Sequence, residues 1–403
     1  MTTATAECPA IETPPPVLAP TPAPAVPGLH CIVAREALLR ALILCAAVAP
    51  TRCPKPILAC VKLTAAQGRL QLCATDLERS ICLSMPDSQA AVEHDGEVAV
   101  PLKDLLGIVR KSADATLTLD LQEDHLYVRG TDARFKLATE DVACFPPLPQ
   151  VAGDPAFEVD ADALTRMIGQ TLYACAREST RYAQNCVLVE RQGNALSLVA
   201  TDGYRLAIST GDCQTISTGT QTAMVPLRTM AVLAKLLGKP TASRRNTAPL
   251  PVKVYVREHD AIFVVGDATL AATLTEGNFP PYREVIPALG SITADVVTAE
   301  LVNGLERAMV WADGTVNSGV KLSFTSDMLI IRPFDKDLAD AEIHVPVANY
   351  QGEPLEIGFN PRFLLEGVAA TGTERIQLNM RMASKPAMFR THQFLYVVMS
   401  VGL

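Results

Sequence analysis

Residues 200–209 read ATDGYRLAIS, and this stretch decides the fold because a related stretch recurs elsewhere in the chain. The residues just before it, LSLVA at 196–200, alternate in a way that is typical of a strand. Asp202-Gly203 favours a tight turn, since Asp can bond to its own backbone and Gly adopts a positive φ without steric cost. The apolar pattern resumes after Tyr204, so we predict a hairpin.

Asp202 has two interpretations at this point. As a catalytic residue it would act as an acid or a base. As a structural residue it would only form the turn, and the strength of Asp-Gly as a hairpin signal favours this second interpretation.

The surrounding pattern occurs three times. Each copy begins with a stretch that has apolar residues at helical spacing, then has a strand, a turn and a strand, and then a strand end that leads into a second helix. The first helices are REALLRALILCAAVA (35–49), DADALTRMIGQTLYACA (160–176) and TAELVNGLERAMVWA (298–312). The hairpins are LQLCATDLERSICL (70–83), LSLVATDGYRLAIS (196–209) and LIIRPFDKDLADAEI (329–343). The second helices lie in VAVPLKDLLGIVRK (98–111), AMVPLRTMAVLAKLL (223–237) and LEIGFNPRFLLEGVAA (355–370).

The registers of the copies agree. The turn Asp falls at positions 76, 202 and 335, and the residue that opens the second helix falls at 101, 226 and 360. With two helices and many short strands, each copy is an α+β domain of ordinary size. The Pro-rich segments CFPPLP (144–149) and NFPPYREVIP (278–287) suit domain ends. We therefore predict a disordered Pro/Ala-rich leader at 1–28, domains at 29–149, 150–288 and 289–403, and a surface loop at 238–251.

Composition narrows the class of protein. The net charge is −8 and 19 % of the residues are charged, which argues against a simple DNA-coating protein. The eleven cysteines sit singly in apolar runs and no export signal precedes them, so we expect buried, reduced thiols and a cytoplasmic protein. We expect no membrane span, because no run of about 18 uncharged apolar residues occurs.

The chain offers little chemistry of its own. Six scattered histidines form no ligand pair, and no Cys-x-x-Cys occurs, so we expect no metal site and no cofactor. No convincing pair of nucleophile and base is present. One enzymatic alternative uses Asp76 and Asp202 as paired carboxylates, but their equivalent positions in separate repeats would keep them apart.

Basic residues gather on the predicted helices. Residues 226–247 hold five basic residues and no acidic one, and the second helix of the first copy holds Lys103, Arg110 and Lys111 against Asp104. The first helix of the second copy and the residues after it add Arg166, Arg177 and Arg181. Isolated charges usually mean a solvated face. In an acidic protein, however, this grouping indicates a positive surface that faces a polyanion.

The repeated ATDLE and ATDGYRLA, the segment FPPYREVIP and the C-terminal FLYVVMSVGL together resemble the bacterial DNA polymerase III β subunit, the sliding-clamp family. The resemblance runs from about residue 29 to the end. It implies three tandem clamp domains that close, as a head-to-tail homodimer, into a six-domain ring around double-stranded DNA. Such a ring slides without sequence preference and tethers a polymerase, so the chain would be a processivity factor and not an enzyme.

The resemblance also assigns residues. Those expected to touch DNA are Arg52, Arg181 and Tyr182, and, from helix placement, Arg110 and Arg228. At the dimer seam, Phe135 and Leu137 would meet Val310 and Trp311, although Trp311 could equally be a core residue. Lys103 and Arg134 would face the acidic run Asp335, Asp337, Asp340 and Glu342.

A groove between the second and third domains is expected to take short linear peptides from the DNA polymerase III α subunit and from clamp-loader subunits. Its expected positions are Thr201, Gly203, Tyr204, Arg205, Leu206, Pro280, Val285, Pro386, Val397, Val398 and Met399. The sequence departs from the family pattern at Tyr204 and in the tail Met399–Leu403. One alternative is therefore a specialised or inhibitor-insensitive second clamp. An alternative of a different class is a static peptide-binding scaffold that never encircles DNA.

Overall fold

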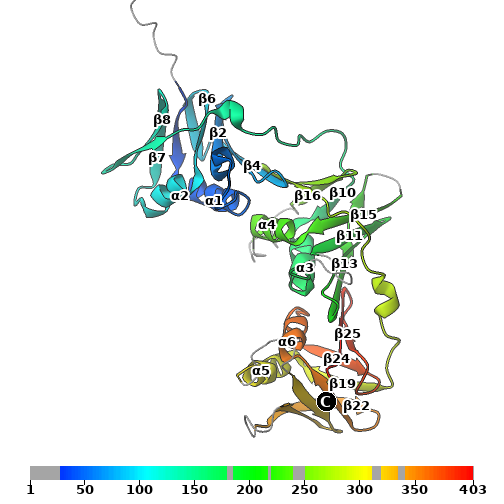
Figure 1. The fold of residues 1–403 in the computed structure, drawn as a ribbon. Coiled ribbons are helices and arrows are strands. Elements are labelled where there is room, and N and C mark those ends of the chain that lie inside the picture. The colour runs from blue at the N-terminus through cyan, green and yellow to red at the C-terminus, as the bar shows by residue number, and fades with distance from the viewer. Residues whose placement is uncertain are drawn as a thin grey trace, which may run out of the picture.

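The computed structural model describes residues 28–178, 185–216, 219–238, 250–310, 319–334 and 341–402. The predicted leader (apart from Gly28) and most of the predicted 238–251 loop lie outside these ranges. The same holds for Arg181, Tyr182, Trp311 and Asp335. Within the described ranges the chain forms three domains that follow one another along a crescent (Figure 1).

The first domain holds the helices α1 (Arg35–Ala46) and α2 (Leu102–Lys111). Its strands are β1 (His30–Ala34), β2 (Cys60–Ala66), β3 (Arg69–Thr75), β4 (Arg79–Met85), β5 (Ala90–His94), β6 (Gly96–Pro101), β7 (Thr116–Gln122), β8 (His125–Arg129) and β9 (Arg134–Ala138). The second domain holds α3 (Ala161–Thr171) and α4 (Leu227–Leu237). Its strands are β10 (Phe157–Asp160), β11 (Cys186–Gln192), β12 (Ala195–Thr201), β13 (Arg205–Asp212), β14 (Gln214–Thr215), β15 (Thr220–Pro226), β16 (Pro251–Val256), β17 (Asp260–Val265) and β18 (Ala268–Thr273).

The third domain holds α5 (Thr298–Ala308) and α6 (Pro361–Ala369). Its strands are β19 (Ile292–Val297), β20 (Val320–Phe324), β21 (Met328–Pro333), β22 (Ile343–Gln351), β23 (Leu355–Phe359), β24 (Arg375–Met380), β25 (Ala387–Arg390) and β26 (Phe394–Val398). The predicted helices are thus present in all three repeats. The residues predicted to open the second helices, Pro101, Pro226 and Asn360, are the N-caps of α2, α4 and α6.

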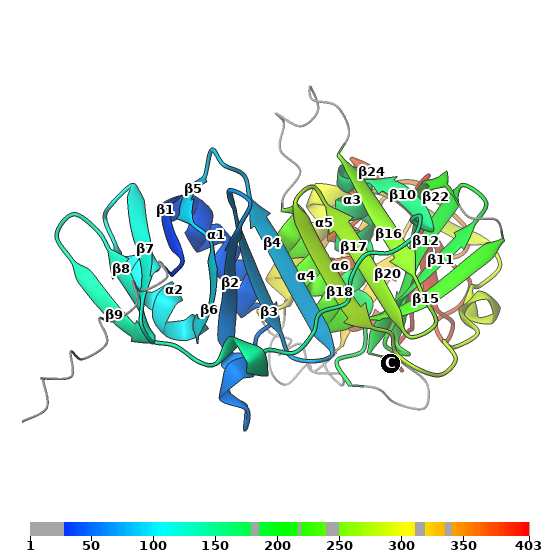
Figure 2. The same ribbon diagram turned by 90° about the horizontal axis from the view of Figure 1, so that it is seen from above.

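The sheets run continuously from one domain into the next. A nine-stranded sheet has the order β14-β10-β16-β17-β18-β4-β3-β2-β6, so β18 of the second domain pairs with β4 of the first (Figure 2). A twelve-stranded sheet has the order β15-β11-β12-β13-β26-β25-β24-β19-β22-β21-β20-β23, so β26 of the third domain pairs with β13 of the second. Each domain seam is therefore a row of backbone hydrogen bonds, which holds the crescent together.

The helices cover one side of these sheets. The two helices of each domain lie together on the inner side of the crescent, and the sheets form its outer side (Figure 1). The apolar positions at helical spacing on these helices face the sheets, as the buried Leu102, Leu105 and Val109 of α2 do. Their polar positions remain exposed along the inner side of the crescent.

The predicted turn is built in the same way in the first two repeats. In the second repeat, Asp202 Oδ1 accepts hydrogen bonds of 3.0 Å from the backbone N–H groups of Tyr204 and Arg205. In the first repeat, Asp76 Oδ1 accepts one of 2.7 Å from the backbone N–H of Arg79. Both carboxylates are therefore turn residues, as the hairpin signal indicated, and each also binds the Arg side chain three residues on.

The two turns share a backbone conformation that suits glycine. Gly203 has φ 87°, and the corresponding Leu77 has φ 78°, in the left-handed region that a branched side chain rarely adopts. The Leu77 side chain is 59 % exposed, so little packing offsets the steric cost.

We expect Leu77→Gly to stabilise the first domain by about 1 kcal/mol, because glycine adopts this φ without the Cβ clash. Urea unfolding measures the change, and Gly203→Ala should shift the midpoint in the opposite direction. A Leu77→Gly protein that is no more stable than the wild type would contradict this account of the turn.

One prediction about the cysteines is wrong. Cys73 and Cys82 form a disulfide between β3 and β4, where we expected free thiols throughout. The hairpin register places the two residues directly opposite each other with a Cα–Cα distance of 4.3 Å, which is within bonding reach. Eight other cysteines in the described ranges are free, and most of them are buried.

Candidate functional site

The main candidate site is a groove where the second and third domains meet. β13 and β26 lie side by side there, with Leu206 opposite Val397, and the backbone N–H of Met399 donates to Tyr204 O at 2.9 Å. The linker that joins the two domains, residues 275–286, crosses above these strands. A cavity of about 580 Å³ lies between the linker and the strands.

Nine of the eleven residues predicted for the groove line this cavity. They are Thr201, Gly203, Tyr204, Arg205, Leu206, Pro280, Val285, Val397 and Met399. The other two do not line it. Side chains alternate between the two faces of β26. Since Val397 faces the groove, Val398 faces the core, where it is fully buried. Pro386 lies in the turn between β24 and β25, away from the lining.

The linker supplies groove residues that the sequence analysis missed. Phe279 and Tyr282 line the cavity beside Pro280, and their rings meet edge to face at 6.2 Å. Tyr282 also packs on a cluster of apolar residues on the outer sheet face: Leu188, Val199, Leu206, Met388, Leu395 and Val397. The aromatic residues of the FPPY segment could have indicated that this linker packs on the protein, because a linker that stays free in solvent has no need of large aromatic side chains.

A hydrogen-bonded carboxylate holds the linker in place. Glu190 accepts 2.7 Å hydrogen bonds from the Tyr282 hydroxyl and from the Arg283 guanidinium. Burial works against the charge of Glu190, but these hydrogen bonds outweigh it and lower its pKa. Burial together with the same carboxylate raises the pKa of Tyr282 to about 12, so the phenol remains a donor at neutral pH.

We expect Glu190→Gln to loosen the linker and to lower the free energy of unfolding by about 1 kcal/mol. Hydrogen exchange of residues 279–286 and urea unfolding measure the two effects. The folded-state pKa of Glu190 is depressed. The ionised carboxylate therefore stabilises the folded protein at pH values above its unfolded-state pKa of about 4.3, and this stabilisation disappears as the pH falls through its folded-state pKa. Wild type and variant should therefore converge in stability once the pH has fallen below the depressed pKa of Glu190 in the folded state. A constant difference from pH 7 to pH 3 would contradict the role of the ionised carboxylate.

Arg205 ties the groove to the third domain. Its side chain is 7 % exposed, and its guanidinium bonds to Asp202, to the carboxylate of Glu366 in α6 and to the backbone oxygen of Tyr173. It also lies 4.4 Å from the ring centre of Phe363, on which Tyr204 stacks. Burial opposes its charge, but the phenol oxygen of Tyr396 and the two carboxylates raise the pKa of Arg205, which stays charged.

A second candidate site is the inner face of the helices. Arg110 in α2, Arg228 in α4 and Arg52 in the loop after α1 are all exposed. Arg166 of α3 is different, because its guanidinium turns inward to Ser209 Oγ, Gln170 and the backbone oxygen of Thr210. It therefore does not belong to the free basic surface. Burial lowers its pKa.

The third candidate site is a pair of sheet edges. In the described part of the chain, β9 pairs only with β8, and residues 343–346 of β22 pair only with β21. Phe135 on β9 is 41 % exposed, whereas Leu137 is buried in the first domain's own core. Lys103 is exposed in the first turn of α2, and Val310, just after α5, is 76 % exposed.

Within the described ranges, no group of three or more potential ligands is placed to hold a metal ion. In the same ranges, none of the helices has the length and apolar character that crossing a bilayer requires. Asp76 and Asp202, the pair considered for catalysis, lie in different domains and are each bound within their own turn.

Comparisons with known proteins agree with this architecture. Family profiles for the N-terminal, central and C-terminal domains of the DNA polymerase III beta subunit match residues 29–149, 158–281 and 283–401. A beta sliding clamp from Pseudomonas aeruginosa is 30 % identical over 379 residues, which cover 93 % of this chain and all of that protein. A beta sliding clamp from Synechococcus elongatus is 30 % identical over 363 residues, 88 % of this chain and 94 % of the relative.

Solved structures of sliding clamps share this three-domain architecture. The crystal structure of the Pseudomonas aeruginosa sliding clamp bound to griselimycin superposes with a TM-score of 0.83 at 29 % identity, covering 93 % of this chain and 100 % of that one. The sliding clamp of Bacillus subtilis superposes with a TM-score of 0.85 at 21 % identity, a likeness of fold. These relatives do not favour the alternative of a specialised second clamp. The chain belongs to the family of bacterial DNA polymerase III beta subunits, the sliding clamps.

Proposed function

We propose that two copies of this chain close head to tail into a six-domain ring that encircles duplex DNA and tethers a polymerase for processive synthesis. One observation carries the proposal. At both domain seams, the last strand of one domain pairs with the strand that follows the turn in its neighbour: β18 with β4, and β26 with β13. By the same rule β9 should pair with the first half of β22. Both edges are open within the described chain, since β9 ends its five-stranded sheet and residues 343–346 of β22 pair with β21 alone.

The open edge of β9 carries the backbone groups that such a pairing needs. The backbone N–H of Gly130 donates to Ala133 O at 2.9 Å, which closes the β8–β9 hairpin and fixes the alternation of its ladder. In an antiparallel pair the groups of Arg134, Lys136 and Ala138 then point away from β8. A head-to-tail contact between two different edges closes a ring when its rotation permits. The seam proposed here includes Lys103, Phe135, Leu137, Val310 and Trp311.

The inner face of the helices would face the DNA. Arg52, Arg110 and Arg228 are exposed and can neutralise phosphates without reading bases, and we keep Arg181 and Tyr182 in the same role. The sheets face outward. The net charge of −8 therefore does not conflict with DNA binding, since basic side chains gather on the inner side. The function needs no bond to be made or broken, and we place it in the cytoplasm.

The groove would bind short linear peptides of the polymerase α subunit and of the clamp loader. Its lining is mostly apolar, with Leu206, Val285, Val397 and Met399 around a cavity large enough for one or two aliphatic or aromatic side chains. A peptide anchored there gains effective concentration from the ring, because the partner cannot diffuse away from the DNA. Domain boundaries near residues 149 and 288 fit this use, since the second linker is itself a wall of the groove.

Met399→Glu is expected to reduce peptide affinity at least tenfold, because a charged side chain would enter the apolar cavity. Fluorescence titration with a labelled peptide that carries adjacent aliphatic and aromatic anchors measures it. Met382→Glu is the matched control. It alters another exposed methionine (52 % exposed, against 45 % for Met399) that does not line the groove. Equal loss in both variants would refute the assignment of the groove.

A further inference from the structure

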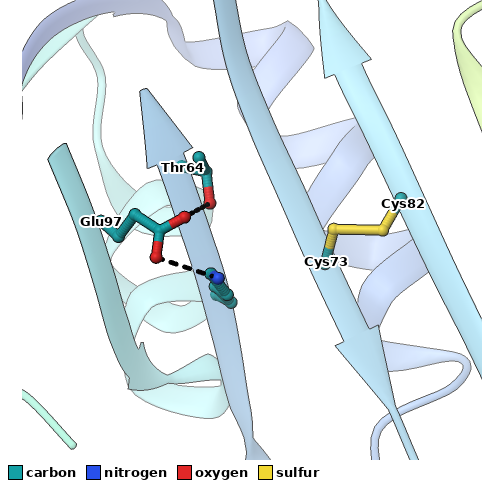
Figure 3. Close-up of a disulfide and its surroundings, with 5 residues drawn as sticks. Thr64, Cys73, Cys82 and Glu97 are labelled. Atoms are coloured by element: carbon teal, nitrogen blue, oxygen red, sulfur yellow. Dashed lines mark hydrogen bonds and ion pairs between the residues drawn. A yellow bond between two sulfur atoms is a disulfide. The ribbon is translucent and has the colours of Figure 1, made fainter. Parts of the chain in front are cut away.

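We propose that the Cys73–Cys82 disulfide is a redox-sensitive modification site that sets how firmly the first two domains are joined. The pair lies on the outer face of the nine-stranded sheet, between neighbouring strands β3 and β4 (Figure 3). The second repeat has Val199 opposite Ile208 at the corresponding place. A pair of apolar side chains therefore suffices for the fold at this position. The disulfide of the first repeat is not needed for packing.

The sulfur pair is accessible to small molecules. Both cysteines line a cavity of about 450 Å³ that lies under residues 145–151, the Pro-rich linker between the first and second domains. Cys73 is 5 % exposed, whereas Cys82 is partly exposed. A thiol that enters the cavity therefore meets the sulfur of Cys82 first.

The site sits directly on the seam between the domains. Cys82 in β4 lies opposite Thr269 in β18. The strand β4 therefore carries the disulfide to β3 on one side and pairs with the second domain on the other. The seam is fastened at its ends by two backbone hydrogen bonds, Ser84 N–H to Asp267 O at 3.0 Å and Thr273 N–H to Glu78 O at 2.8 Å. A cross-link that restrains β4 against β3 therefore also restrains the strand on which the second domain is fastened.

A salt bridge lies on the strands beyond Cys73. Lys62 of β2 is the register neighbour of Cys73, and its ammonium is held 3.0 Å from Glu97, which also accepts a hydrogen bond of 3.2 Å from Thr64. Figure 3 shows Thr64 on β2, the strand next to β3, and Glu97 on β6, one strand further from the disulfide.

The exchange balances with small thiols as the reductant. A thiolate attacks Cys82 Sγ, forms a mixed disulfide and breaks the bond to Cys73, which leaves as a thiolate and takes a proton from water. A second thiolate attacks the reagent sulfur of the mixed disulfide and releases Cys82. Two small thiols become one small disulfide, and two electrons and two protons pass to the protein. With a small-molecule disulfide as the oxidant, the same steps run in reverse.

The biological meaning of the switch rests on the proposed function in one respect. A clamp on chromosomal DNA works among reducing thiols, where protein disulfides are typically transient and redox-sensing. The chemistry itself does not depend on the clamp activity. It is therefore tested on the isolated full chain without DNA, and its failure would leave the ring untouched.

The first test maps the thiols. The protein is equilibrated with glutathione, denatured in an alkylating reagent and examined by peptide mass mapping, which separates the Cys73–Cys82 bond from glutathione bound at exposed thiols such as Cys144. Cys73 and Cys82 should be joined to each other after equilibration with oxidised glutathione and both alkylated after equilibration with reduced glutathione. A pair that is alkylated under both conditions, or joined under both, would overturn the redox switch.

The second test follows the seam. Reduction should speed hydrogen exchange of residues 79–85 and 268–273 at least tenfold and leave the β13–β26 seam, residues 205–209 and 394–398, unchanged as an internal reference. The double variant Cys73→Val/Cys82→Ile copies the pair of the second repeat, so it should fold and give one exchange rate in both glutathione states. A seam whose exchange does not change on reduction of the wild type would refute the coupling to the domain junction.

Discussion

Lys136→Pro is expected to convert the proposed dimer into monomers while leaving the first domain folded. Lys136 forms a non-hydrogen-bonded pair with Tyr127 of β8, so its own N–H points to the open edge of β9. Proline removes that donor, which leaves an acceptor of the partner strand unsatisfied at a cost of about 1–3 kcal/mol, and it also places its ring in the path of the partner strand. At about 1.4 kcal/mol for each tenfold change, the dissociation constant should rise roughly tenfold to a hundredfold.

Sedimentation over a range of concentrations measures this change. The wild type should sediment at twice the 43.1 kDa mass of the chain and the variant at the single mass. Lys136→Ala is the matched control, because it removes the side chain and keeps the N–H, and it should stay dimeric. A dimeric Lys136→Pro protein would mean that β9 is not the edge that joins the copies.

Arg205→Met is expected to lower the free energy of unfolding by about 3 kcal/mol, because it removes a buried cation from the half-buried carboxylates of Asp202 and Glu366 and leaves Glu366, among the described residues, with only the exposed Arg362. The guanidinium bonds to Asp202 within its own turn and to Glu366 of the third domain. Methionine can fill the space beside Phe363, but it cannot satisfy the carboxylates. Urea unfolding, with hydrogen exchange at the β13–β26 seam, should place the loss at the junction of the second and third domains.

The first repeat supplies the control for this variant. Arg79 bonds to Asp76 in the corresponding turn, and its contacts in the described ranges include no carboxylate from a neighbouring domain. Arg79→Met should therefore cost at least 1 kcal/mol less than Arg205→Met. Equal losses would show that Glu366 contributes nothing to the junction.

The periodic parts of the fold could be predicted from the sequence. Apolar spacing placed the helices, and the Asp at positions 76 and 202 placed turns that the structure builds with the same hydrogen bonds. The corresponding turn of the third repeat, at Asp335, lies outside the described residues. The groove on β13 and β26 was predicted through the resemblance, but alternation in β26 should have excluded Val398 once Val397 was placed in the groove.

Other features depend on strand register and on contacts between distant parts of the chain, which the pattern of residue types does not specify. The Cys73–Cys82 disulfide was missed because each cysteine was interpreted singly within its apolar run. Counting outward from the turn at Asp76 places the two opposite each other, so the register held the signal. The contacts of Tyr282 with Glu190 and of Arg205 with Glu366 join residues far apart in the chain, and only the folded arrangement brings them together.

The central claim is that the protein holds DNA by encircling it, and retention on a circular plasmid tests this most directly. The protein is loaded by a clamp loader onto nicked circular plasmid, the free protein is removed by gel filtration in high salt, and the plasmid is then cut once with a restriction enzyme. The account predicts that protein stays with the circular form and is released from the linear form within minutes, since a ring slides off an end. Equal retention on both forms, or equal loss from both, would contradict topological binding.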